Sequence, residues 1–188
     1  QGTIQIIDRS GNDTISGEDM VRIDRSEIPE LTFGFSLTAE YKGFDFSALL
    51  QGQARAHYYQ ALGASQQHYV LGEGENNLAF RAENRWWYDN TDGTMPRVGD
   101  RISPVMTDFY LFPGSFIRIK NIEIGYSLPV KLLNRISISR LRLYISGYNL
   151  YTFSKNKWID PENDNRGKGE LYNYPINRVY NFGVNLTF

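Results

Sequence analysis

The sequence predicts an all-β protein, namely five strands of a larger antiparallel transmembrane β-barrel. The first observation is the length of the alternating apolar and polar runs, which exceeds the five to six residues typical of globular strands and suits a tilted membrane-spanning strand. The second is the regular succession of short and long connections. The third is the composition of the 188 residues, with 14% aromatics, 17 glycines and a mean hydropathy of −0.45. Such modest hydropathy fits a barrel wall because only every second residue needs to face lipid.

The remaining composition narrows the function classes. Lys and Arg total 20 against 21 Asp and Glu, and this balance gives no reason to expect a nucleic-acid partner. The absence of cysteine excludes disulfides, thiol nucleophiles and Cys-bound zinc, and the only histidines are His57 and His68. No run approaches 18 apolar residues, so no membrane-spanning helix is expected. No leader precedes Gln1, so we expect a mature chain or one cut from something longer.

The first two predicted strands form a hairpin. Residues 31–41 alternate without a break, and residues 44–58 continue the alternation with apolar side chains at even positions. Between them lies Lys42-Gly43, and two residues containing glycine are a hairpin signal.

Three further strands are predicted downstream, at residues 115–128, 140–153 and 177–188. In the first of these the apolar phase changes near Lys120-Asn121, as expected for a β-bulge, where one extra residue restores a single apolar face. In the second, Asn149 interrupts the apolar row.

The connections predict the orientation of the strands in a membrane. Residues 42–43 and 129–139 are short connections, whereas residues 59–114 and 154–176 are long. Outer-membrane barrels have short periplasmic turns and long extracellular loops, which assigns residues 1–30 to another extracellular segment. Five strands alone would leave two open edges that lipid does not tolerate, so the rest of the barrel must come from a further region or another chain.

Several sequence blocks resemble the C-terminal end of the SusC/RagA family of TonB-linked outer-membrane transporters of Bacteroidetes. The clearest is GSFIRIKNIEIGYSLP, followed by LRLYISGYNLYTF and a terminal block ending NFGVNLTF. The blocks occur in the family's order and lie at residues 31–35, 41–47, 114–129, 141–153, 160–162, 174–175 and 178–188.

The resemblance implies the last five strands of a barrel of about 22 strands. It also implies a bacterial outer-membrane importer of oligosaccharides or peptides, which works with a SusD-like surface lipoprotein as a lid and is driven by TonB. The family's plug domain and TonB-contacting segment have no counterpart in these residues, so the chain would supply wall and loops. No cofactor is required by this interpretation.

The C-terminus resembles the assembly signal of outer-membrane barrels. This signal combines a polar residue, a glycine, an apolar residue and a terminal aromatic, here Asn181, Gly183, Leu186 and Phe188. The other interpretation is an ordinary last strand.

A degraded calcium loop is the one candidate metal site. Its oxygen ligands would be Asp8, Ser10, Asn12, the Thr14 carbonyl, Ser16 and Asp19. The sixth position carries Asp13 in place of the usual glycine, and Asp19 is shorter than the usual glutamate. A polar, turn-rich loop without metal is the alternative.

Aromatic residues in the long loops are candidate ligand contacts. Trp86, Trp87, Tyr88 and Trp158 could stack on sugar rings or cover peptide side chains. The alternative is loop packing or contact with the lid lipoprotein.

The polar face of the predicted strands carries a set of cations and amides, which we interpret as a hydrated lumen wall. They are Gln51, Gln53, Arg55, His57, Arg118, Lys120, Arg140 and Arg142. The carboxylates Asp160 and Glu162 are of a kind common in solvated loops. No nucleophile-elbow motif occurs, and a glycosidase needs two carboxylates placed across a sugar, which spacing alone does not show. We therefore expect no enzyme.

Two alternatives to a transporter remain at this point. One is a soluble carbohydrate-binding β-sandwich, and the other is an enzyme on an all-β scaffold. Strand length, loop alternation and the terminal Phe188 argue against the sandwich.

Overall fold

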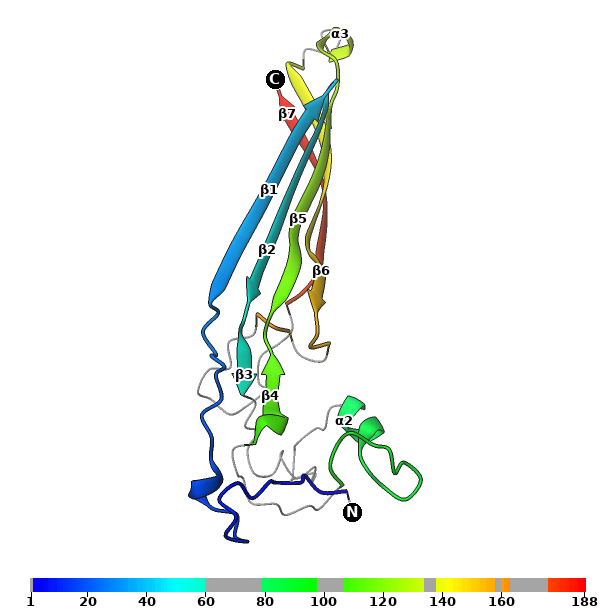
Figure 1. Ribbon diagram of the computed structural model, residues 1–188. Helices are drawn as coiled ribbons and strands as arrows, with labels where there is room; N and C mark the ends of the chain where they lie inside the picture. The colour runs from blue at the N-terminus through cyan, green and yellow to red at the C-terminus, as the bar shows by residue number, and fades with distance from the viewer. Residues whose placement is uncertain (1, 60–78, 98–106, 134–137, 158–159, 163–175) are drawn as a thin grey trace. The chain divides into compact units, whose positions relative to one another are not determined.

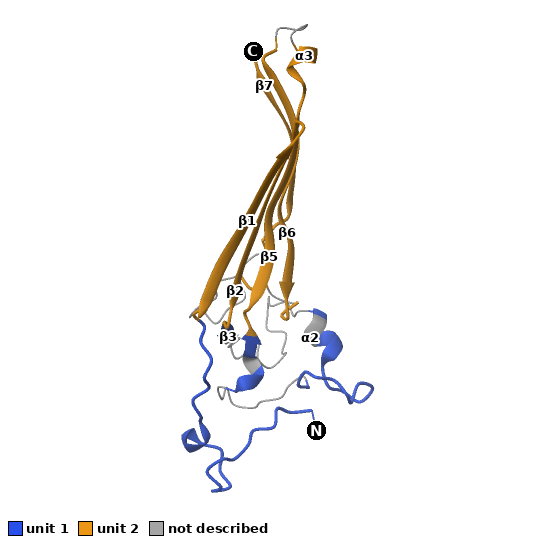
Figure 2. Cartoon of the chain, turned by 45° about the horizontal axis from the view of Figure 1, so that its top comes forward, with its two compact units in different colours: residues 1–27, 57–112, 164–173 blue, residues 28–56, 113–163, 174–188 orange. Residues whose placement is uncertain are grey.

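A computed structural model describes residues 2–59, 79–97, 107–133, 138–157, 160–162 and 176–188 (Figure 1). The chain divides into two compact units, coloured separately in Figure 2. Unit 1 comprises residues 1–27, 57–112 and 164–173, and unit 2 comprises residues 28–56, 113–163 and 174–188. In the described ranges, no helix has the length and apolar character needed to cross a membrane. The assignment of all 188 residues to one barrel domain remains a prediction.

Unit 2 contains a five-stranded antiparallel meander. The strands pair in the order β1-β2-β5-β6-β7, so each long strand neighbours the next long strand along the chain. Their bounds are β1 Leu31–Tyr41, β2 Phe44–Ala54, β5 Phe116–Ser127, β6 Arg140–Ser154 and β7 Val179–Thr187. At 9 to 15 residues they have the length of membrane-spanning strands.

The short connections and the C-terminus lie at one end of this sheet (Figure 1). Lys42 and Gly43 join β1 to β2 with φ angles of 48° and 87°. Positive φ at both central positions defines the type I′ hairpin turn, whose twist matches the flanking strands. The Gly43 carbonyl accepts a hydrogen bond of 2.7 Å from the Ser127 amide, which ties this turn to the end of β5. The β5–β6 connection contains a short helix, α3 (Val130–Leu133).

The register confirms the change of apolar phase in β5. Leu49 pairs with Asn121 whereas Leu50 pairs with Ile119, so Lys120 is the extra residue of a bulge. A second irregularity lies in β6 around Asn149, whose φ is 53°. The bulge at Lys120 keeps one apolar face along β5, as the change of phase predicted, whereas a bulge at Asn149 was not predicted.

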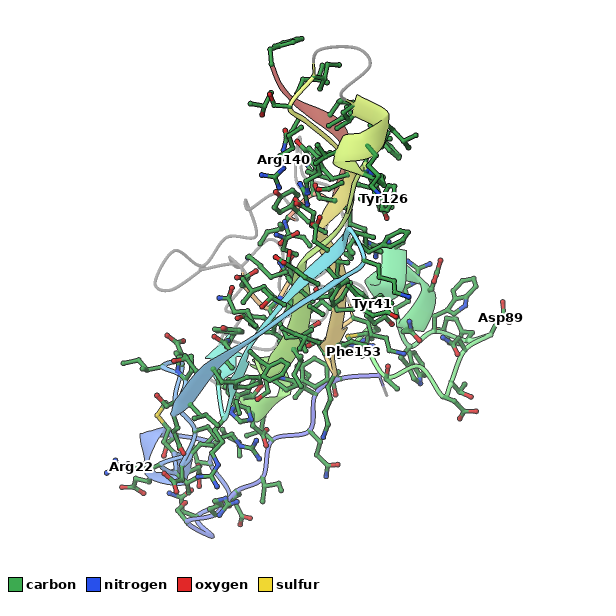
Figure 3. The ribbon with its side chains drawn as sticks, turned by 90° about the horizontal axis from the view of Figure 1, so that it is seen from above. Arg22, Tyr41, Asp89, Tyr126, Arg140 and Phe153 are labelled. Carbon is green, nitrogen blue, oxygen red and sulfur yellow. The ribbon has the colours of Figure 1, made fainter. Side chains whose placement is uncertain are left out.

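One row of paired residues illustrates the two faces. Paired positions across the five strands place these side chains on the same face: Ala39, Phe46, Ile124, Ile145 and Phe182. Successive residues in a strand point to opposite faces, so the intervening polar residues line the other side. In Figure 3, Tyr126 and Arg140 project to opposite sides of the strands.

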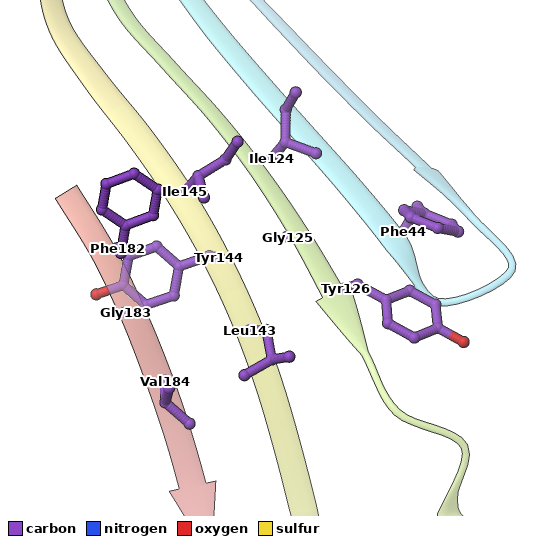
Figure 4. Close-up of a pocket in the computed structure, with 10 residues that line it drawn as sticks. All are labelled: Phe44, Ile124, Gly125, Tyr126, Leu143, Tyr144, Ile145, Phe182, Gly183 and Val184. Carbon is purple, nitrogen blue, oxygen red and sulfur yellow. The ribbon is translucent and has the colours of Figure 1, made fainter. Parts of the chain in front are cut away.

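Burial in the sheet is inverted relative to a soluble protein. Apolar side chains on one face are exposed, and Phe182 reaches 83%. The best buried side chains of the strands include Arg118 and Ser146 on the polar face. A hollow of about 440 Å³ lies against the apolar face and is lined mainly by side chains such as Ile124, Ile145 and Phe182 (Figure 4). This distribution is that of a barrel wall with lipid outside and polar groups inside.

The predicted second strand, 44–58, is too long. Strand β2 ends at Ala54, because Arg55 adopts a left-handed φ of 56° and turns the backbone out of the pleat. Gly114 then donates to the Ala56 carbonyl at 2.8 Å, and the short strand β3 (His57–Tyr59) pairs with β4 (Leu111–Pro113). Alternating composition continues through Arg55, so the sequence pattern alone could not locate this bend.

Unit 1 holds most of the short elements. They are the 3-10 helices η1 (Gly17–Asp19) and η2 (Asp108–Tyr110), the helix α2 (Ala79–Asn84), the strand β3 and most of β4. Helix η1 begins with a capping box, in which the Ser16 side chain and the Asp19 carboxylate satisfy each other's backbone amides.

Candidate functional site

The polar face of the sheet carries a buried ion-pair cluster around Arg118. Its guanidinium, 2% exposed, pairs with Asp160 and lies 2.6 Å from Glu162 Oε2. Its Nε donates to Thr152 Oγ1 at 2.8 Å. Lys120 Nζ lies 3.0 Å from the second oxygen of Glu162, Oε1. The guanidinium therefore has a partner for each of its three nitrogens, which offsets much of its desolvation.

This cluster anchors the start of the long β6–β7 connection. Asp160 Oδ1 also accepts the Glu162 amide at 3.0 Å, and its Oδ2 accepts the Ile176 amide at 3.4 Å. Arg118 thus holds a carboxylate that itself organises the backbone at both sides of the connection. We name Arg118, Lys120, Thr152, Asp160 and Glu162 the loop anchor.

A second cluster spans three strands nearer the short turns. Arg142 on β6 pairs with Asp45 on β2 through both Nε, at 3.0 Å from Oδ1, and Nη2. The same Nη2 lies 2.7 Å from Glu123 Oε1 on β5. The guanidinium reaches across β5 because Gly125 has no side chain; a Cβ there would collide with both Arg142 and Asp45.

The expectation of a merely hydrated wall is wrong for Arg118 and Arg142. Both are held by carboxylates at the sheet surface, and neither is exposed. The interpretation of Asp160 and Glu162 as solvated loop carboxylates is also wrong. Sequence reasoning missed these partners because they lie 19 to 97 residues away from the arginines along the chain. The only local signal was the clustering of basic residues at alternate positions in the two strands.

The sequence pattern placed His57 on the polar face of the second predicted strand, but the structure does not place it in β2. It lies in β3, where Arg25 Nη1 donates to its Nε2 at 2.6 Å. Burial and the positive charge of Arg25 lower the pKa of His57, so the ring is neutral at physiological pH.

The loop predicted to bind calcium is closed by its own carboxylates. Asp8 Oδ1 accepts the Gly11 amide at 2.7 Å, and Oδ2 accepts the Asp13 amide at 2.7 Å. Asp19 Oδ1 accepts from Ser10, and Oδ2 from Ser16. These backbone amides hold the pKa of Asp19 far below its usual range.

The remaining proposed calcium ligands take part in the same network. Asn12 Oδ1 accepts the Thr14 amide at 2.9 Å, and Ser16 Oγ accepts the Glu18 amide at 3.2 Å. No group of three or more acidic or histidine side chains suited to a metal occurs among the described residues. In this geometry the oxygens of these side chains accept hydrogen bonds from backbone N–H groups of the loop. Calcium binding by this loop remains a prediction.

The aromatic candidates in unit 1 differ in exposure. Trp86 is half-buried and lies against the backbone of Gly2, where an added Cβ would collide with its ring. Trp87 and Tyr88 are 46% and 86% exposed at a tight turn closed by hydrogen bonds between Trp87 and Asn90. Trp158 lies outside the described residues. Of the three described candidates Trp86, Trp87 and Tyr88, only the last two therefore present large aromatic surfaces to solvent.

The predicted assembly residues lie on or directly after the last strand, β7. Asn181 pairs with Ser146 and Gly183 with Tyr144 on the polar face, whereas Leu186 pairs with Leu141 on the apolar face. Phe188 follows the end of β7 and is exposed. Their role in assembly remains a prediction.

The two faces and the strand lengths define the class of protein, a segment of a transmembrane β-barrel wall. No family model matches the chain. TonB-dependent receptor P3 of Formosa agariphila is 32% identical over 96% of this chain and 18% of the relative. TonB-dependent receptor SusC of Bacteroides thetaiotaomicron is 27% identical over 97% of this chain and 17% of the relative.

Solved structures give the same result. The RagAB peptide importer in its closed-closed state superposes with a TM-score of 0.71 and 30% identity, covering 97% of this chain and 20% of that chain. The open-open state gives a TM-score of 0.66 at 30% identity. The chain spans about a fifth of the length of the relatives it matches. Over nearly its whole length it is homologous to a barrel segment of SusC- and RagA-type TonB-dependent receptors, as the sequence blocks predicted.

Proposed function

We propose that this chain forms part of the wall and the extracellular loops of a TonB-dependent outer-membrane importer. The observation that carries the proposal is the inverted sheet, with exposed apolar side chains on one face and buried or half-buried ion pairs on the other. Homology to receptors named SusC and TonB-dependent receptor supports the same function. An enzyme is not supported by these relatives.

The polar face would line the lumen of the importer. A lumen wall must be polar to pass hydrophilic solutes, yet rigid enough to keep the loops in place. The loop anchor meets both needs, because it puts charged groups on the polar face and holds the β6–β7 connection to β5 and β6.

The partners that we propose for this chain are those of SusC/RagA-type transporters, which it resembles. We propose that the rest of the barrel and its plug complete the pore, that TonB acts through those parts, and that a SusD-like lipoprotein covers the extracellular side. The substrate class is an oligosaccharide or a peptide; the name of the RagAB peptide importer supports the peptide.

Membrane fractionation with affinity capture tests the proposal. The complete protein that contains these residues, tagged at an extracellular loop, should be found in outer membranes, require detergent for extraction and retain a surface lipoprotein during purification. Uptake of a labelled peptide mixture or oligosaccharide panel should cease when TonB is deleted. Recovery of the protein in buffer without detergent would contradict the proposal and favour the soluble carbohydrate-binding sandwich.

The exposed turn aromatics make a second test of the same function. We expect Trp87→Ala and Tyr88→Ala to weaken binding of ligand or lid about ten-fold or more, because exposed aromatics dominate the energetics of such contacts. Trp86→Ala is the matched control: its ring packs on Gly2, so the change should lower stability more than affinity. Titration calorimetry of the purified complex with oligosaccharides and with oligopeptides measures the affinity, and scanning calorimetry measures the stability. Equal affinity in all three variants would leave only a packing role.

A further inference from the structure

Two glycines on the polar face each receive a large side chain from the neighbouring strand. A Cβ built on Gly183 of β7 would collide with the ring and hydroxyl of Tyr144 on β6. A Cβ built on Gly125 of β5 would collide with Arg142. Figure 4 shows the ring of Tyr144 lying over β7 beside Gly183.

These contacts form a continuous chain across four strands. The Arg142 guanidinium carbon lies 5.0 Å from the centre of the Tyr144 ring, within the range of a cation–π contact. Arg142 is in turn fixed by Asp45 on β2 and Glu123 on β5. The register places Asp45, Gly125, Tyr144 and Gly183 in one row across β2, β5, β6 and β7.

We infer that Tyr144 and Arg142 form a brace that locks the last strand to the sheet, and that Gly183 is required because it receives the Tyr144 ring. This inference rests on the proposed function, since it gives a structural reason for the glycine of the predicted assembly signal. Tyr144 acts as a positioning residue. Its ring fixes the register of β7, and Arg142 extends the constraint to β2.

The alternative explanation is that an assembly machinery reads Gly183 directly. A double-mutant cycle separates the two explanations. The brace predicts that Gly183→Ala lowers the ratio of folded to unfolded barrel about ten-fold or more, because the extra methyl forces the Tyr144 ring aside. It also predicts that adding Tyr144→Ala removes most of that effect, so the double variant is no worse than Tyr144→Ala alone.

Two further variants sharpen the cycle. Tyr144→Phe keeps the ring and should not rescue Gly183→Ala. Gly34→Ala on the polar face of β1 is the matched control, because among the described residues its added Cβ would meet only the Leu50 carbonyl oxygen at 3.9 Å. That change should leave folding unaltered.

The experiment is run on the complete protein, refolded into lipid vesicles without assembly machinery and also expressed in cells. The folded fraction is read by heat-modifiable gel mobility and urea titration. Rescue of Gly183→Ala by Tyr144→Ala in both settings is the expected result. Additive effects in vesicles, or damage seen only in cells, would overturn the brace. A wild-type protein that forms no membrane-inserted barrel at all would instead overturn the proposed function.

Discussion

Replacing Arg118 with methionine will release the β6–β7 connection from the polar face. The change leaves Asp160 and Glu162 without their principal partner, at positions that are themselves largely buried. Removing one member of a buried ion pair costs about 3–5 kcal/mol, and we expect about 3 because both carboxylates keep some contact with water. Hydrogen exchange at the amides of Glu162 and Ile176, which donate to Asp160, should accelerate accordingly.

The matched control for this prediction is Arg55→Gln. Arg55 forms a single ion pair with Glu30 at 2.9 Å, and both side chains are exposed. Exposed pairs contribute little to stability. We therefore expect no measurable change in exchange or in the urea midpoint.

The triple variant R118M/D160N/E162Q should recover part of the stability that R118M loses, because it removes the charges that R118M leaves unpaired. Slow exchange in R118M would contradict the loop anchor.

A lysine at Leu37 will destabilise the barrel in lipid, whereas a lysine at the next residue will not. Leu37 lies near the middle of β1 on the apolar face and is 49% exposed. A lysine on the lipid face at the bilayer midplane costs about 2–4 kcal/mol. Thr38 is also exposed but pairs with Ser47 on the polar face, so Thr38→Lys should lie within the lumen and be tolerated.

Urea titration of the complete protein in lipid vesicles measures both lysine variants. The difference between adjacent residues of one strand isolates the effect of the face from that of strand propensity. Equal stability of the two variants would show that the apolar face does not contact lipid. It would remove the main support for a membrane location.

The strands could be predicted from sequence because alternation is a local property. The strand β1 occupies the predicted residues 31–41, and the phase change at Lys120-Asn121 is a bulge in the structure. Each depends only on neighbouring residues and on the two-residue period of a strand. The bend at Arg55 was missed because its φ of 56° interrupts a run whose composition still alternates.

The partners of the charged residues could not be predicted, because they depend on register and on loop return. Arg118 meets Asp160 across 42 residues, and Arg142 meets Asp45 across 97. The same holds for Gly183, which the sequence marks only as part of a terminal pattern. That a tyrosine ring covers it becomes visible only when β6 and β7 are paired.

The sequence by itself therefore determined the architecture: long two-faced strands, a two-residue hairpin turn, a bulge and the relationship to a transporter barrel. The strands, the turn and the bulge follow from side-chain period and turn chemistry, which act over a few residues, whereas the relationship follows from the resemblance of ordered sequence blocks. Only the tertiary structure decided that the basic residues of the polar face are paired, that the 8–19 loop closes on backbone amides and that Tyr144 fills the space over Gly183. The physical reason is that ion pairs and packing are set by distances between strands, which the order of residues along one strand does not contain.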